Sequence, residues 1–231
     1  MNLLSKISNK KGLSDYRYNK IVIFKYSINI SKSKFILNIY PDASKKSHFY
    51  KIVLGSFVYE ISTKYSISSI TINSKNKLDL DTLIFGFKQK DFIYSKYKNK
   101  SNYSIFKTNY KLPKNYSSLL NSMYLLKELV TEPSNIIYPS SFVKKTQEKM
   151  NKKNINLKTL SKKEIIKIGL NCLLAVSQGS QREPKVMEFS KKNIRKNVDI
   201  LFVGKGVCFD SGGISIKPSG GMEDMKWDMA G

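Results

Sequence analysis

The last twenty-nine residues of the chain are dense in glycine, and four of their charged side chains have the types and spacing for metal chemistry: Lys205, Asp210, Lys217 and Asp228. The two aspartates offer hard carboxylate oxygens, which suit Mg²⁺, Mn²⁺ or Zn²⁺. A lysine beside such a cation loses its proton more readily, because the field disfavours the ammonium, and the amine then offers a lone pair. Spacing alone leaves two interpretations open: a metal site, or a glycine-rich turn with ordinary surface Lys–Asp pairs.

Two phosphate-binding motifs do not match this stretch. A phosphate-binding loop needs two glycines separated by four residues and then Lys and Ser or Thr. Here Lys205 lies between Gly204 and Gly206, and Val207 follows. The dinucleotide-binding fingerprint fails as well, since Phe209 occupies its third glycine position. Metal chemistry therefore fits these residues better than phosphate binding.

The segments before this stretch are expected to position it. The apolar run 199–203 predicts a buried strand, and ligand sites of open α/β sheets gather where strands end, here at Lys205 and Asp210. Helices are predicted at 140–150 and, from the capping box of Ser161 and Glu164, just after residue 161. Further strands are predicted at 155–159, 173–176 and 184–189. This alternation predicts a mixed, mostly parallel sheet with helices on both faces.

The first half of the chain is predicted to be a smaller, strand-rich α/β domain. Short β-branched or aromatic runs predict strands at 20–25, 34–40, 50–54, 69–73 and 82–87, and residues 91–102 predict a loop or hairpin. A helix is predicted at 114–131, where apolar residues recur every three or four positions up to Pro133. The expected division is an α/β domain at 1–113, a linker helix at 114–131 and a second domain at 132–231.

The composition is strongly basic, with 41 Lys and Arg against 17 Asp and Glu and a formal net charge of +24. The lysines are scattered, and from Leu201 onward three basic residues face four acidic ones. This pattern favours a solvated lysine-rich surface over a specific nucleic-acid site. No apolar run approaches the roughly 20 residues of a membrane helix. Cys172 and Cys208 are interpreted as buried, reduced thiols of a cytoplasmic protein.

The terminal stretch resembles the leucyl aminopeptidase (cytosol aminopeptidase) family. The resemblance rests on residues 204–218, GKGVCFDSGGISIKP, and on residues 221–231, GMEDMKWDMAG. Weaker similarities are LVTEPSN at 129–135 and LLAVSQGS at 173–180. It covers residues 117–231 well, whereas the N-terminal domain matches only in position and α/β character.

The resemblance implies a two-metal aminopeptidase that releases N-terminal residues, leucine among them, from peptide substrates. Lys205 would be a neutral-amine ligand of one metal, Asp210 would bridge both, and Asp228 would complete the first site. The two ions would be Mn or Zn. Lys217 would stay protonated and polarise the scissile carbonyl, and Met225 would line the pocket for the first side chain of the substrate, although a core methionine is an equal alternative. The family also implies a homo-oligomer, a hexamer.

Family members carry a further metal-binding Asp and Glu, and an Arg, roughly sixty residues beyond Asp228. We therefore expect the chain to be a fragment with an incomplete catalytic domain, inactive by itself. The alternative is a non-catalytic family member, a scaffold or nucleic-acid-binding protein that acts through its basic N-terminal domain.

Overall fold

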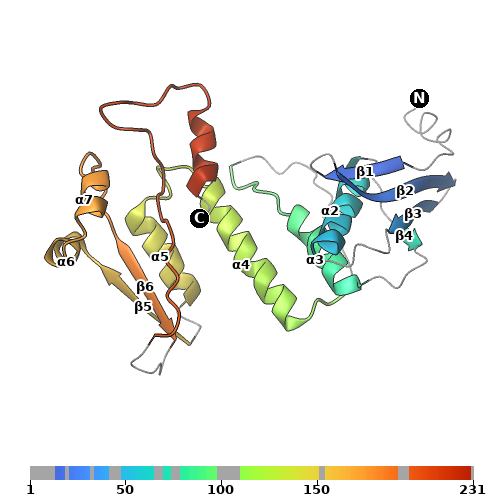
Figure 1. Ribbon diagram of the computed structural model, residues 1–231, viewed down its shortest axis with the longest axis horizontal. Helices are drawn as coiled ribbons and strands as arrows, with labels where there is room; N and C mark the ends of the chain where they lie inside the picture. The colour runs from blue at the N-terminus through green and yellow to red at the C-terminus, as the bar shows by residue number, and fades with distance from the viewer. Residues whose placement is uncertain are drawn as a thin grey trace. The chain divides into compact units, whose positions relative to one another are not determined.

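The computed structural model describes residues 14–18, 21–31, 34–41, 48–64, 70–73, 79–97, 110–150, 154–191 and 198–229. The chain forms two compact units, Met1–Tyr124 and Leu125–Gly231, and each is described by itself (Figure 1). Both contain helices and strands, which agrees with the α/β class predicted from the sequence.

The described sheet of the first unit has its strands in the order β1-β2-β3-β4. Its members are β1 (Ser14–Tyr18), β2 (Ile21–Ser31), β3 (Lys34–Pro41) and β4 (Ile70–Asn73). β1, β2 and β3 pair antiparallel, while β4 pairs parallel to β3, with Ile72 opposite Leu37. The long connection between β3 and β4 contains a helix, as a parallel crossover requires. The strands predicted at 20–25, 34–40 and 69–73 are confirmed.

Two segments predicted as strands are helices. The run 50–54 lies inside α2 (His48–Lys64), and the run 82–87 lies inside α3 (Leu80–Lys90). Short apolar runs fit a buried strand and a buried helix equally well by periodicity. In α2 the buried residues Leu54, Val58 and Ile61 recur at helical spacing. These predictions were wrong because helix-to-helix packing, rather than strand pairing, buries the two runs.

The close approach of α2 and α3 depends on one glycine from each helix. A Cβ atom on Gly55 would lie 2.0 Å from the carbonyl oxygen of Leu83, and one on Gly86 would lie 2.1 Å from that of Ile52. The hydroxyl of Ser56 donates to the carbonyl of Gly86 across the same contact, at 3.2 Å. Any larger residue at either glycine would force the helices apart.

The helix predicted at 114–131 is confirmed as α4 (Lys114–Thr131), and the boundary between the two units falls inside it. Its N-terminal part belongs to the first unit, where the ring of Tyr116 lies 5.4 Å from that of Phe85. Residues 91–97 form neither helix nor strand, as predicted, and 98–102 lie outside the described residues. The predicted domain limits at 113 and 131 stay predictions.

The second unit contains one described strand pair with short helices around it (Figure 1). Its elements are α5 (Pro139–Met150), β5 (Ile155–Leu160), α6 (Lys162–Lys167), α7 (Asn171–Ser177), β6 (Val186–Lys191) and the 3₁₀ helix η1 (Met222–Met229). The predicted helix at 140–150 and the strands at 155–159 and 184–189 are confirmed. So is the capping box, in which Ser161 and Glu164 each accept a backbone N–H from the other.

Three expectations for this unit are corrected by the structure. Residues 173–176 belong to α7 and are not a strand. β5 and β6 pair antiparallel, so the parallel pairing expected here is not found between them. Residues 199–203 form neither strand nor helix, and Phe202 and Val203 are about nine-tenths exposed. A strand needs a neighbour to take its backbone hydrogen bonds, and no described strand pairs with this run.

Within the described residues, no helix combines the length and apolarity needed to span a membrane. The two cysteines are free, but Cys172 is exposed, so the expectation of a buried thiol at that position was wrong.

Candidate functional site

The loop after residue 203 folds back on itself, and this brings its charged residues together. Gly212 has a φ of +91°, which a residue with a Cβ rarely adopts, and a Cβ there would lie 2.4 Å from the carbonyl oxygen of Ser215. The backbone N–H of Lys217 donates to the carbonyl of Ser211 at 3.0 Å, and Gly212 and Ile216 form an isolated β-bridge. This tight reversal returns Lys217 to the beginning of the loop.

Asp210 and Lys217 consequently form an ion pair. The Lys217 Nζ donates to Asp210 Oδ2 at 2.9 Å, and the backbone N–H of Gly212 donates to Asp210 Oδ1 at the same distance. These two hydrogen bonds, supported by the charges of Lys217 and Lys205, lower the pKa of the exposed Asp210 carboxyl below its ordinary value. Asp210 is therefore an anionic carboxylate held in a defined orientation.

Met225 completes a cluster of three predicted site residues. The same Lys217 ammonium lies 3.5 Å from the Met225 sulfur, and Met225 is half-buried on η1. The structure therefore joins the residue predicted to act on the carbonyl with the one predicted to line the substrate pocket. Sequence spacing did not predict the contact, because it depends on how the loop folds against η1.

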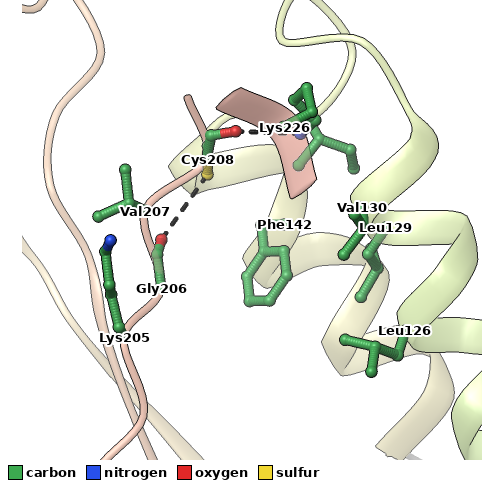
Figure 2. Close-up of a pocket in the computed structure, with 10 residues that line it drawn as sticks. Leu126, Leu129, Val130, Phe142, Lys205, Gly206, Val207, Cys208 and Lys226 are labelled. Carbon is green, nitrogen blue, oxygen red and sulfur yellow. Dashed lines mark hydrogen bonds between the residues drawn. The ribbon is translucent and has the colours of Figure 1, made fainter. Parts of the chain in front are cut away.

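Lys205 lines a small pocket within the second unit (Figure 2). The pocket has a volume of about 70 Å³. Residues 205–208 form one side, and apolar side chains of the helices and of the turn between them form the other: Leu126, Leu129 and Val130 from α4, Ile137, and Phe142 from α5.

The ammonium of Lys226, from η1, also lines the pocket and donates to the carbonyl oxygen of Cys208 at 3.0 Å. Burial raises the pKa of the Cys208 thiol, and the nearby Lys226 charge opposes this rise.

Asp228 lies on η1, three residues after Met225, and its side chain is outside the described part of the structure. Among the described side chains, no three His, Cys, Asp or Glu residues come together as a metal-binding group. The set Lys205, Asp210 and Asp228 is of a different kind, because it contains a lysine and the undescribed Asp228 side chain. The assignment of these three residues as metal ligands thus stays a prediction.

The residues present are chemically suited to a divalent cation. Asp210 is exposed, carries a lowered pKa, and already binds a cationic group, the Lys217 ammonium. A carboxylate has about four lone-pair sites, and hydrogen bonds occupy two of them here, so each oxygen retains capacity for a metal. The donor set therefore fits a hard or borderline dication.

Sequence reasoning did not single out Gly212 or Lys226. The signal for Gly212 was its position in the Ser-Gly-Gly run between two residues of predicted function. The signal for Lys226 was its place between Met225 and Asp228. Only the contact with the distant Cys208 carbonyl distinguishes it from an ordinary surface lysine.

Comparison with known families places this site in context. Residues 124–231 match the sequence profile described as "Cytosol aminopeptidase family, catalytic domain". Residues 124–231 belong to that family. The match contains the loop, the pocket and η1, and the family named from the sequence motifs is confirmed for this part of the chain.

Curated cytosol aminopeptidases resemble about half of the chain. A probable cytosol aminopeptidase of Phytoplasma mali (strain AT) is 45% identical over 120 residues, which are 51% of this chain and 24% of that protein. One of Wolbachia pipientis wMel is 42% identical over 111 residues, or 48% of this chain and 22% of that protein. The chain thus spans about a quarter of the length of these relatives.

Solved structures extend the likeness in fold to both units. A cytosol aminopeptidase from Coxiella burnetii is similar with a TM-score of 0.63 and 24% identity, over 80% of this chain and 40% of that one. A tomato leucine aminopeptidase is similar with a TM-score of 0.68 and 18% identity, over 99% of this chain and 47% of that one. The bottromycin maturation enzyme BotP, solved in complex with Mn, is similar with a TM-score of 0.64 and 20% identity, over 89% of this chain and 47% of that one. At these identities the likeness establishes the α/β fold.

Proposed function

We propose that this chain contributes to a two-metal aminopeptidase that releases N-terminal amino acids, with a leucine-type preference, from peptides. The observation that carries the proposal is the meeting of Asp210, Lys217 and Met225 inside the stretch that matches the aminopeptidase catalytic domain. A carboxylate, a charged donor and an apolar side chain are the parts that such a reaction needs in one place.

Lys205, Asp210 and Asp228 would hold the metal ions, two Mn or Zn ions per subunit. The ions would supply Lewis-acid activation of water and of the peptide carbonyl. The exposed Asp210 carboxylate is oriented for this role by the Gly212 amide. Manganese is supported by the Mn complex of the structurally similar BotP enzyme.

Lys217 would act as the electrophile. Its ammonium donates hydrogen bonds, and a charged donor stabilises the negative charge that develops on the carbonyl oxygen when a peptide bond is attacked. Met225 lies against this ammonium, so a substrate side chain that packs on its flexible thioether would sit next to the reacting carbonyl. The protein would be cytoplasmic and would assemble as a homo-oligomer, a hexamer by family resemblance.

Metal binding by the 231-residue chain tests the proposal. We expect Mn²⁺ binding, followed by electron paramagnetic resonance of the free ion, to weaken at least about ten-fold in Asp210→Ala. Asp199→Ala removes another exposed aspartate of the same unit and is expected to bind like the wild type. Hydrolysis of a leucine chromogenic amide by the same 231 residues is expected to stay at background, because Lys205, Asp210 and Asp228 alone would leave the second metal with Asp210 as its one ligand.

Mn²⁺ binding that is unchanged in Asp210→Ala would contradict the proposal. Binding of nucleic acid that falls steeply with salt and ignores this substitution would favour the alternative, a non-catalytic basic protein. Turnover well above background would show that the chain needs no further metal ligands.

A further inference from the structure

Lys226 joins the two segments that carry the candidate site. It lies on η1 between Met225 and Asp228, and its ammonium donates to the backbone carbonyl of Cys208 at 3.0 Å (Figure 2). Cys208 is two residues before Asp210 on the other segment. The bond therefore connects the helix that carries one predicted metal ligand with the loop that carries two.

The surroundings of this bond make it more than a surface contact. The Cys208 carbonyl belongs to a loop without helix or strand, so it needs a hydrogen-bond donor from elsewhere. Lys226 is half-buried beside Leu129, Val130 and other apolar side chains of the pocket. Burial lowers the pKa of Lys226, while the neighbouring Cys208 and the fully buried Glu132 oppose this shift. A hydrogen bond to a charged donor is stronger in such low-dielectric surroundings than in water.

A second contact between the same segments restricts their relative orientation. Met225 touches the ammonium of Lys217 at 3.5 Å, while its neighbour Lys226 reaches back to Cys208. Adjacent residues of η1 thus contact the loop at two points nine residues apart in sequence. Two points of attachment oppose rotation of η1 on the loop, which a single point would permit.

We propose that Lys226 is a positioning residue, which sets the position of η1, and with it Asp228, relative to Lys205 and Asp210. The inference rests on the proposed function, because it concerns the same metal ligands. It acts through the backbone carbonyl of Cys208 and requires no chemistry of the Cys208 thiol. A metal site tolerates little displacement of its ligands, so loss of the bond should weaken metal binding more than it disturbs the fold.

The test uses two substitutions at one position and one control. Lys226→Met keeps the length and apolar character of the side chain but removes the donor. Lys226→Arg keeps a charged donor that reaches the carbonyl. Lys185→Met removes a lysine of the same unit that is also half-buried and donates to Glu183 at 3.3 Å. If Lys226→Met does not fold by circular dichroism, Lys226→Gln replaces it, because its amide is shorter and uncharged.

The first measurement needs no metal. Trp227 is the one tryptophan of the sequence and lies on η1 beside Lys226, with 65% of its surface exposed. We expect its fluorescence anisotropy in the metal-free chain to fall in Lys226→Met and to keep the wild-type value in Lys226→Arg and Lys185→Met. Equal anisotropy in wild type and Lys226→Met would overturn the inference.

The second measurement is Mn²⁺ affinity of the same proteins. We expect about ten-fold weaker binding in Lys226→Met, as is common when a group that orients a metal ligand is removed, and binding within two-fold of wild type in the other two variants. Wild-type affinity in Lys226→Met would overturn the inference. Absence of Asp210-dependent Mn²⁺ binding in the wild type would contradict the proposed function instead, and the anisotropy of the metal-free chain would still decide whether Lys226 positions η1.

Discussion

The Nζ atom of Lys217 lies 2.9 Å from Oδ2 of Asp210, although seven residues separate them in sequence. An ammonium therefore occupies one side of the carboxylate that is predicted to bind two cations. The Lys217 ammonium and a metal cation would repel each other at this carboxylate, and the effect of this repulsion on metal affinity can be measured.

Replacing Lys217 by Met is expected to strengthen Mn²⁺ binding. Removing one positive charge about 4 Å from a cation site in water-like surroundings changes the binding energy by about 1 kcal/mol per unit charge of the ion, or about 2 kcal/mol for Mn²⁺, so we expect roughly thirty-fold tighter binding. Asp210→Ala is expected to act in the opposite direction. A calorimetric titration of both variants checks the signs, and weaker Mn²⁺ binding in Lys217→Met would mean that the lysine supports the metal site rather than competing with it.

Gly55→Ala is expected to destabilise the first unit by about 3 kcal/mol, because its Cβ would collide with the backbone of α3. Gly179→Ala is the matched control, since nothing lies within 4 Å of a Cβ at that position. Its effect is expected to stay within about 0.5 kcal/mol. Urea unfolding followed by far-ultraviolet circular dichroism compares the two, and equal stabilities would show that α2 and α3 do not approach as closely as described.

Lys145→Met is expected to lower the unfolding free energy of the second unit by roughly 3 kcal/mol. Lys145 donates at 3.0 Å to Glu132, whose side chain is fully buried, so its loss leaves a buried carboxylate without this counter-charge. Lys185→Met breaks a pair with the exposed Glu183 and is expected to cost less than about 1 kcal/mol. Trp227 fluorescence reports unfolding of this unit. Similar losses of unfolding free energy in Lys145→Met and Lys185→Met would contradict a special role for the buried Glu132 pair.

Stability of the first unit is expected to fall between about pH 10 and pH 12. Burial, aided by the charge of Asp91 and by Tyr59, raises the pKa of Tyr124 to about 12, against 10 in the unfolded chain. Below pH 10 both states hold the proton, so the contribution of Tyr124 is complete. Above pH 10 the unfolded chain loses its proton first, and stability declines until the folded group titrates as well.

Tyr124→Phe removes this titration and is expected to flatten the decline without abolishing it, since burial also raises the pKa of Tyr59. Urea midpoints measured at pH 9, 10 and 11 give the slope of stability against pH for each protein. The same slope in the wild type and in Tyr124→Phe would show that Tyr124 does not cause the decline.

Features set by local rules could be predicted from the sequence. The helix at 114–131 follows from a regular apolar stripe ended by Pro133, and the capping box of Ser161 and Glu164 needs only neighbouring residues. The motifs at 204–218 and 221–231 identify the family because they are long and unusual. The ligand roles of Lys205, Asp210 and Asp228 derive from the same resemblance and stay predictions.

Tertiary structure decided what depends on partners distant in sequence. The runs 50–54 and 82–87 fit a strand or a helix, and the folded chain places both in helices that pack closely at Gly55 and Gly86. The run 199–203 fits a strand, yet it is exposed because no described strand pairs with it. The meeting of Lys217 with Asp210 and the reach of Lys226 to Cys208 depend on a loop reversal at Gly212 and on the packing of η1. Sequence shows which groups the site contains, whereas their distances arise only when the chain folds, because hydrogen bonds and packing join residues that spacing leaves apart.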